Sequence, residues 1–218
     1  MQRAKPSNWP RPNPNPKALI EGQAALIVVD IQASAFVGDD NDKDRAIPHM
    51  ADYRTRMERA RTVIDTARDH DIPVIFIQEI HRANGIDFGR ELDGSETVHC
   101  LDSNELTNIA AEQLGFRDDD YLIQKRRYSA FFGTDLEILL RGLKVETLIL
   151  IGGLTDVCIH YTFADAHQSD YYCRVIEDCV AGSNDAAHDA SLRAMEYLQT
   201  GAIRGLEETL AAMKTPSN

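Results

Sequence analysis

The chain has 218 residues, a length that suits one α/β domain with a full hydrophobic core. Its 35 acidic and 23 basic side chains give a formal net charge of −12, which argues against a surface for nucleic acid or an anionic membrane. No apolar run approaches the ~20 residues that cross a bilayer, and residues 1–17 lack the apolar core of a signal peptide. We therefore expect a cytoplasmic protein whose four cysteines, which show no CxxC spacing, are free thiols.

The N-terminal segment 1–17 is rich in proline. Its prolines are Pro6, Pro10, Pro12, Pro14 and Pro16. Prolines at alternate positions block helix formation and favour an extended polyproline conformation. We expect a tail that lies over the surface of the domain or of a neighbouring subunit, with a docking motif for a partner as the alternative. Residues 18–218 then form a single domain.

Strands and helices alternate along the rest of the chain. Apolar runs predict strands over residues 24–29, 73–77, 121–123, 145–151, 173–177 and 202–203. Helical spacing predicts helices over residues 50–68, 104–114, 134–141, 158–169, 185–199 and 206–213. A long polar loop covers residues 80–102, and loops of this length in a compact domain are usually functional. The alternation predicts an α/β fold of three layers, with a doubly wound, mainly parallel sheet of about six strands and helices on both faces.

Three of the predicted strands end in side chains that can carry chemistry. Asp30 follows the first strand, Lys125 follows the third, and Cys158 comes just after the fourth. Taken alone, each has a plain structural role: Asp30 as a turn cap, Lys125 as part of a basic surface run, and Cys158 as a small core residue. Sites in open α/β sheets lie beyond the carboxyl ends of the strands, so three such residues at adjacent strand ends predict an active site.

Residues 149–160 read ILIGGLTDVCIH, an apolar strand that breaks at two glycines and resumes with helical spacing. This pattern places Cys158 in the first turn of a helix. Free backbone N–H groups and the positive end of the helix dipole gather there and favour a thiolate, the reactive form of cysteine.

A mechanism follows from these residue types. Lys125 is expected to lower the pKa of the Cys158 thiol, and Asp30 to accept its proton. The thiolate would attack a carbonyl carbon to form a thioester, which water then cleaves. The developing oxyanion needs aimed donors, for which the backbone N–H groups of Cys158 and of Leu154 or Thr155 are well placed.

At this point the sequence resembles the isochorismatase-like cysteine hydrolase family, which includes nicotinamidases, N-carbamoylsarcosine amidases, ureidoacrylate and biuret amidohydrolases, and true isochorismatases. Three blocks carry the resemblance, in matching order along residues 20–205. Residues 29–32 read VDIQ at the end of an apolar strand. Residues 125–136 read KRRYSAFFGTDL, similar to K-x-x-x-S-A-F-x-G-T-x-L, and residues 152–158 read GGLTDVC, similar to G-x-x-T-[DN]-x-C.

The resemblance implies a catalytic triad of Asp30, Lys125 and Cys158. It also implies a cis peptide bond between Gly153 and Leu154 that aims the Leu154 N–H into the oxyanion hole. True isochorismatases cleave a vinyl ether and typically lack the cysteine, so Cys158 favours hydrolysis of the C–N bond of a small amide, ureido or carbamoyl compound. The alternatives are an isochorismatase-type ether hydrolase and a catalytically idle interaction module.

The nicotinamidase branch of the family carries a metal site made of D-x-H and two further histidines. Here the matching stretch offers Glu79 and His81, with His99 far downstream. Because glutamate replaces aspartate and no histidine lies between His81 and His99, we expect no metal and no cofactor. Glu79 and His81 would then contact substrate or order the loop.

Further side chains near the three blocks are candidate substrate contacts, although each could equally serve packing. The full set is Phe36, Glu79, His81, Tyr128, Phe131, Tyr161, Thr162 and Gln199. The other charged residues of loop 81–99 are expected to form a solvated, mutually paired surface. The expected partners are a small-molecule amide and further copies of this chain, because the relatives are commonly dimers or tetramers; nucleic acid and membranes are not expected.

Overall fold

The computed structural model describes residues 9–38 and 46–215. Its centre is one six-stranded sheet in the order β3-β2-β1-β4-β5-β6, with every neighbouring pair parallel. The strands are β1 (Gln23–Val29), β2 (Val74–Glu79), β3 (Tyr121–Lys125), β4 (Val145–Gly153), β5 (Tyr172–Ala181) and β6 (Ile203–Arg204). The predicted doubly wound α/β fold is thereby confirmed.

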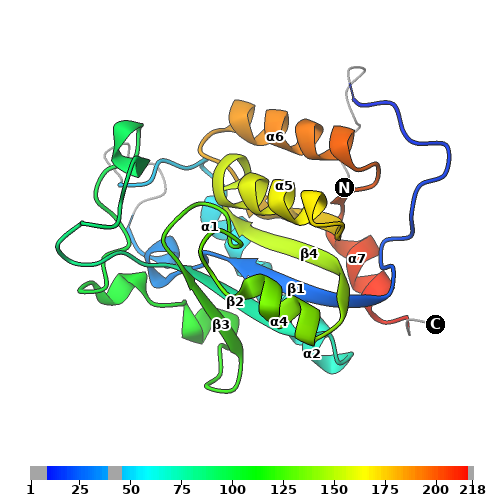
Figure 1. Cartoon of the computed structure of the whole chain (residues 1–218), viewed down its shortest axis with the longest axis horizontal. Helices are drawn as coiled ribbons and strands as arrows, with labels where there is room; N and C mark the ends of the chain where they lie inside the picture. The colour runs from blue at the N-terminus through cyan, green and yellow to red at the C-terminus, as the bar shows by residue number, and fades with distance from the viewer. Residues whose placement is uncertain (1–8, 39–45, 216–218) are drawn as a thin grey trace.

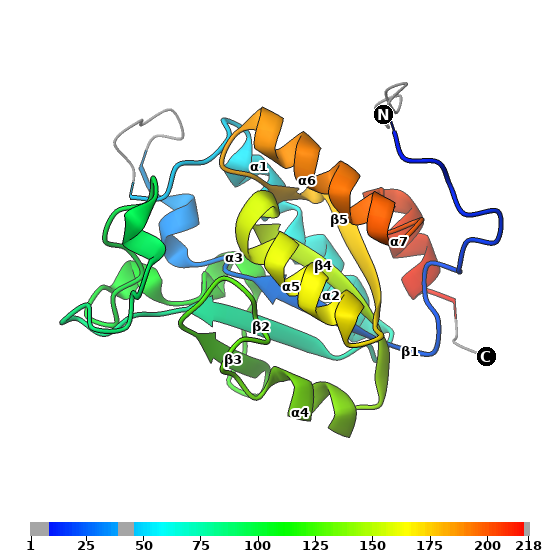
Figure 2. The same ribbon diagram turned by 45° about the horizontal axis from the view of Figure 1, so that its top comes forward.

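Helices cover both faces of the sheet (Figures 1 and 2). One face carries α1 (Tyr53–Glu58), α2 (Ala60–Asp69), α3 (Ala111–Leu114) and α7 (Leu206–Met213). The other carries α4 (Leu136–Gly142), α5 (His160–Gln168) and α6 (Asp185–Leu198). No helix among the described residues is long and apolar enough to cross a membrane.

Strand alternation gives the molecule two cores rather than one. In β1, Leu26 and Val28 pack toward α1 and α2, whereas Ile27 and Val29 pack toward α4 and α5. All four side chains are fully buried. Successive side chains of a strand point to opposite faces, so a strand covered by helices on both sides must be apolar throughout. This is why the inner strands read as continuous apolar runs.

Some element bounds differ from those expected. The helix predicted over residues 50–68 is two helices, α1 and α2, which are separated at Arg59. The helix predicted over residues 104–114 is a short 3-10 turn, Glu105–Thr107, followed by the four residues of α3. Periodicity reports which residues face the core, and that pattern persists through a break in the helix.

Strand β5 is longer than the predicted 173–177, because an irregularity in its pairing with β4 inserts extra residues. Leu150 pairs with Val175, but Gly152 pairs with Val180. The carbonyl groups of this irregular segment accept hydrogen bonds from α1 and its end: Arg56 donates to Glu177 O at 2.7 Å and Arg59 to Asp178 O at 2.8 Å. These tertiary contacts, which no local pattern reports, allow the strand to continue.

Residues 1–8 of the proline-rich tail lie outside the described residues. Residues 9–17 form neither helix nor strand, as the prolines require. The Asn13 N–H donates to Thr200 Oγ1 at 3.0 Å, and the Lys17 ammonium lies 5.5 Å from the centre of the Tyr172 ring. This part of the tail therefore lies against the amino-terminal end of β5 and the segment after α6.

Arg174 on β5 fastens the segment that precedes β1. Its side chain is fully buried and donates to the carbonyl oxygens of Ala18 and Leu19, at 2.5 and 2.9 Å, and to Gln199 Oε1 at 2.7 Å. Burial, with a smaller contribution from Arg204, lowers the pKa of the Arg174 guanidinium to about 10. The guanidinium compensates for its burial by donating to four acceptors, the three above and the Cys173 carbonyl oxygen.

We expect Arg174→Leu to lower the free energy of unfolding by roughly 3 kcal/mol or more, because several buried acceptors lose their donor. Urea denaturation measures the change. Arg90→Leu is the matched control, since the Arg90 side chain is 92% exposed, and it should change stability by less than about 0.5 kcal/mol. Equal effects of the two substitutions would contradict the anchoring role of Arg174.

Candidate active site

The three residues predicted at the strand ends do come together. Asp30 follows β1, Lys125 is the last residue of β3, and Cys158 lies shortly after β4. Lys125 Nζ lies 2.9 Å from Asp30 Oδ2 and 3.4 Å from Cys158 Sγ. Asp30 and Cys158 themselves present atoms within 4.8 Å of each other. A base, a cation and a thiol therefore share one buried point at the carboxyl edge of the sheet.

Strand β2 lies between β1 and β3, so the three strand ends are not all adjacent as expected. Its last residue, Glu79, fills the gap between Asp30 and Lys125. Glu79 Oε2 lies 2.5 Å from Lys125 Nζ and 3.6 Å from Cys158 Sγ. The cluster therefore has four members, and Glu79 also lines the wall of the cavity that the cluster faces.

Gly152 allows the β1 and β4 ends to lie close together. It pairs with Val29 and has a φ of 119°, and a Cβ there would lie 2.0 Å from the Val29 carbonyl oxygen. No side chain fits at this distance, and glycine readily adopts this φ. The close approach brings Asp30, the residue after Val29, beside the turn that carries Cys158.

The turn that carries Cys158 is held from several directions. Residues Thr155–Ile159 form a π-helical turn that leads into α5. Asp156 accepts hydrogen bonds from Ser183 N and Ser183 Oγ, at 2.8 and 2.5 Å, and His188 Nδ1 lies 2.8 Å from Thr155 Oγ1. Contacts from the β5–α6 region therefore fix the turn that carries Cys158.

The peptide bond between Gly153 and Leu154 is cis, as the family resemblance implied. The Leu154 carbonyl oxygen accepts from the N–H groups of Val157 and Ile159, both at 3.1 Å. Leu154 and Cys158 both line the cavity described below. That the backbone N–H groups of Leu154 and Cys158 donate to an oxyanion stays a prediction.

Cys158 is held as a neutral thiol in the free protein. Burial raises the pKa of Cys158 well above its ordinary value; Lys125 lowers it, and Asp30 and Glu79 raise it again. This differs from the expected thiolate, because the sulfur is buried and the charge of Lys125 is shared with two carboxylates. The thiol therefore needs a base at the moment of attack.

Asp30 is suited to be that base. Burial raises the pKa of Asp30 to about 6, against the attraction of Lys125 and with the help of Glu79. Burial also raises the pKa of Glu79, but Lys125 and hydrogen bonds from His81 and His99 outweigh it and leave the pKa well below its ordinary value. Burial lowers the pKa of Lys125, but its carboxylate neighbours raise it further, so the ammonium stays charged. Of the two carboxylates, Asp30 therefore accepts a proton more readily.

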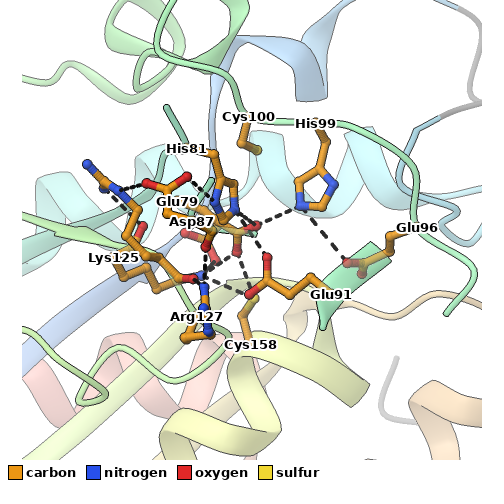
Figure 3. A network of polar contacts seen from close by, with 12 residues as sticks. Glu79, His81, Asp87, Glu91, Glu96, His99, Cys100, Lys125, Arg127 and Cys158 are labelled. Carbon is orange, nitrogen blue, oxygen red and sulfur yellow. Dashed lines mark hydrogen bonds and ion pairs between the residues drawn. The ribbon is translucent and has the colours of Figure 1, made fainter. Parts of the chain in front are cut away.

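A second polar cluster lies behind Glu79 (Figure 3). His99 Nε2 lies 2.8 Å from Glu79 Oε1, and His81 Nε2 lies 3.5 Å from the same oxygen and 3.1 Å from Glu91 Oε2. Burial lowers the pKa of His81, but its bonds to Glu79 and Glu91 raise it to about 9. The pKa of His99 is likewise raised, since Glu79 outweighs the effect of burial.

These four side chains could instead hold a divalent cation. Their ligand atoms lie within 4.8 Å of one another, and all four residues are buried. Imidazole nitrogens and carboxylate oxygens suit zinc, manganese or iron. An ion there would replace the histidine protons and supply positive charge beside Lys125. Glu91 supplies the fourth ligand, whereas the sequence pattern offered only Glu79, His81 and His99. That the site works without a metal stays a prediction.

The cluster of Asp30, Glu79, Lys125 and Cys158 opens into a cavity of about 240 Å³. Its lining residues come from the β1–α1, β2–β3, β3–α4 and β4–α5 connections, from the start of α1 and from the ends of the strands. Those used below are Asp30, Ile47, His49, Tyr53, Glu79, Glu96, Val98, His99, Leu106, Tyr128, Leu154 and Cys158. A cavity of this size, with the thiol in its wall, fits a small molecule.

Of the predicted substrate contacts, Glu79 and Tyr128 line the cavity. His81 does not, because it is fully buried behind Glu79, where its ring stacks on Phe88 at 4.0 Å between centroids. Phe36 packs against the core on the α1 side.

The other predicted contacts do not line the cavity. Phe131 lies 6.0 Å from the Tyr171 ring, and Thr162 Oγ1 accepts from Ala130 N at 2.9 Å. The Tyr161 side chain lies largely outside the cavity, with 56% of the residue exposed. Gln199 is corrected most clearly: it accepts from Cys173 N at 2.7 Å, at the amino end of β5 and thus at the opposite edge of the sheet from the site.

Several cavity residues were missed by the sequence interpretation. His49 and Tyr53 form a stacked pair, with ring centroids 4.4 Å apart, and both line the cavity. Tyr53 is the first residue of α1 and also packs against the core, so it is buried as well. Glu91 and Glu96 had been placed on a solvated surface, yet Glu91 is buried and Glu96 lines the cavity. No periodic pattern in a loop reports such burial.

The sequence model of the isochorismatase domain family matches residues 24–208, so the chain belongs to the isochorismatase family of hydrolases. It is 31% identical over 204 residues to a ureidoacrylate amidohydrolase, RutB, of Yersinia enterocolitica, covering 84% of this chain and 85% of the relative. A probable inactive nicotinamidase of Arabidopsis thaliana is 29% identical over 86% of this chain and 96% of its own length. The structure of a pyrazinamidase of Pyrococcus horikoshii in complex with zinc superposes with a TM-score of 0.70 at 25% identity, covering 84% of this chain and 99% of that one.

We expect kcat/KM for hydrolysis to rise with pH through a midpoint near 6, the value to which burial raises the pKa of Asp30. Asp30 must be ionised to take the Cys158 proton, so activity is lost below this pKa. In Glu79→Gln the midpoint should move to lower pH. The negative charge that repels the Asp30 carboxylate is lost and Lys125 no longer has a second carboxylate partner, so the pKa of Asp30 should fall. Glu112→Gln, at an exposed position of α3, is the control. A midpoint that stays in place or rises in Glu79→Gln would contradict this electrostatic coupling.

Proposed function

We propose that this protein hydrolyses the C–N bond of a small amide, ureido or carbamoyl compound, with Cys158 as the nucleophile. The observation that carries the proposal is that Cys158 and Asp30, which both line one cavity, are joined by Lys125 beneath its wall. The named activities of two relatives, a ureidoacrylate amidohydrolase and a pyrazinamidase, support amide hydrolysis. A probable inactive relative makes a direct test of turnover necessary.

The first half of the reaction forms a thioester. Asp30 takes the proton from the Cys158 thiol as the sulfur attacks the carbonyl carbon, so that a C–S bond forms and the carbonyl oxygen becomes negative. The backbone N–H groups of Leu154 and Cys158 would hold that oxygen. When the C–N bond breaks, Asp30 passes its proton to the leaving nitrogen, which departs as a neutral amine or ammonia.

The second half restores the enzyme. A water molecule attacks the thioester carbon while Asp30 takes one of its protons, and the C–S bond then breaks. The acid product leaves, and the proton returns from Asp30 to the sulfur. Lys125 keeps its own proton throughout and holds the carboxylate in place, 2.9 Å away. Should a cation occupy the neighbouring cluster, Glu79, His81, Glu91 and His99 would hold it, and it would supply positive charge beside Lys125.

The presence of a buried thiol beside a base favours amide hydrolysis over cleavage of a vinyl ether. Hydrolysis of a vinyl ether begins with protonation of the double bond, and water then attacks the cation. It has no need of a nucleophile supplied by the enzyme. Amide hydrolysis gains from one, because covalent catalysis divides a difficult step into two easier ones. The position of Cys158 beside Asp30 and Lys125 therefore has a role in amide hydrolysis and none in ether cleavage.

Ammonia release from a panel of ureas, carbamoyl amino acids and aromatic amides tests the proposal. Cys158→Ser should lower the rate by roughly 1,000-fold or more, because the hydroxyl is a far weaker nucleophile at this pH. Cys179→Ser is the matched control, since Cys179 is a buried free thiol that does not line the cavity. Intact-mass measurement during turnover should show one acyl adduct on the wild-type chain. Full activity of Cys158→Ser would exclude the thioester route.

A further inference from the structure

Glu96 in the long loop after β2 places a carboxylate in the wall of the cavity that holds Cys158. The loop is held there by a hydrogen bond from Thr97 N to Ala46 O at 2.9 Å. The Glu96 side chain is only 15% exposed, so its carboxylate is largely removed from solvent. A carboxylate in this position is costly unless a partner of opposite charge meets it.

The described protein supplies only a weak partner. Glu96 Oε2 lies 4.0 Å from His99 Nε2, beyond hydrogen-bonding distance, while the same nitrogen lies 2.8 Å from Glu79. No lysine or arginine lines the cavity within residues 9–38 and 46–215. Lys125 lies beneath the wall and is already engaged by Asp30 and Glu79. Figure 3 shows Glu96 on the far side of His99 from this cluster.

The charges around the cavity add up to an excess of carboxylates. Three carboxylates line the cavity, those of Asp30, Glu79 and Glu96, against two histidines, His49 and His99. Behind them, Glu91 is paired with His81 and Lys125 with Asp30 and Glu79. Burial raises the pKa of Glu96, His99 lowers it, and Glu79 and Glu91 raise it further, as expected of a carboxylate among others. An anionic ligand would add to this excess, whereas a cationic one would reduce it.

The rest of the wall suits the carbon skeleton and the charge of such a ligand. Ile47, Val98 and Leu106 supply apolar surface. Two aromatic elements face the same space: the stacked pair of His49 and Tyr53, and the ring of Tyr128. Aromatic faces attract cations as well as apolar groups. A short alkyl or aryl ligand with one positive nitrogen therefore matches both parts of the wall.

We propose that Glu96 is a specificity-determining residue and that the substrate is a small amide or carbamoyl compound bearing a cationic nitrogen, such as a protonated amine. The inference rests on the proposed amidase function and adds the charge of the substrate. The carbonyl group lies at Cys158 and the cationic nitrogen at Glu96. Three contacts link the two positions: Cys158 Sγ to Glu79 at 3.6 Å, Glu79 to His99 at 2.8 Å, and His99 to Glu96 at 4.0 Å. A chain of a few carbon atoms reaches both.

Three probes of similar size and different charge test the inference: 5-aminopentanamide, hexanamide and glutaric acid monoamide. Their affinities for the Cys158→Ser protein are measured by calorimetry, and ammonia release by the wild type gives kcat/KM. We expect the cationic amide to bind about tenfold tighter than the neutral one and the carboxylate to bind most weakly. Glu96→Gln should remove the preference for the cation, measured as the ratio of the affinities for the cationic and the neutral amide, and Glu96→Asp should restore part of that ratio. Glu112→Gln, exposed on α3, is the charge-matched control.

The outcomes separate this inference from the proposed function. Equal affinities, tighter binding of the carboxylate, no binding of the cationic amide, or a preference that survives Glu96→Gln each overturn the role of Glu96, even if amides are hydrolysed. Charge-selective binding without ammonia release from any probe or from the wider amide panel overturns the amidase function and leaves Glu96 as the selector of a cationic ligand. Selective binding and selective turnover, both lost in Glu96→Gln, support the two together.

Discussion

The buried ammonium of Lys125 is the interaction on which the site depends. A fully buried positive charge is stable only beside negative partners, and Lys125 has two, Asp30 at 2.9 Å and Glu79 at 2.5 Å. These carboxylates end β1 and β2, while Lys125 itself ends β3. One ion network therefore fastens the carboxyl ends of three strands, and the thiol of Cys158 lies at 3.4 Å from its centre. Stability of the sheet edge and chemistry of the site depend on the same charge.

Sharing one lysine between two carboxylates gives them different properties. Glu79 is closer to Lys125 and also receives hydrogen bonds from the two histidines, so its pKa falls and it stays ionised. Asp30 is left with less compensation, so burial raises its pKa to about 6. The division supplies a permanent anion that balances the lysine and a separate base that can gain and lose a proton. A pair of titratable groups pushed apart by its surroundings is how one site holds both roles.

The sequence was sufficient for the fold and for the meeting of Asp30, Lys125 and Cys158, because each follows an apolar run that predicts a strand. The runs before Asp30 and Cys158 are buried strands, whereas β3, which ends at Lys125, is a half-exposed edge strand. It was insufficient for Glu79, whose place in the cluster depends on β2 lying between β1 and β3, and strand order is a property of the whole chain. Gln199 failed for a related reason: it precedes β6, so it lies at the amino edge of the parallel sheet, away from the site. Glu96 and His49 lie in loops, where burial follows from tertiary contacts that leave no periodic trace.

The loop after β2 brings its charged residues to the site because it is held firmly at both ends and in the middle. His81 N donates to Cys100 O and Asp102 N to His81 O, both at 2.7 Å, which closes the loop at its base. Within it, Asp87 accepts from Arg82 at 2.9 Å and from Arg126, just after β3, at 3.1 Å. A loop fixed in this way can hold a carboxylate over a cavity, because collapse onto a distant cation would cost these contacts. Among residues 9–38 and 46–215 the nearest cationic group to Glu96 is His99 at 4.0 Å, so a cationic ligand could supply a closer positive charge.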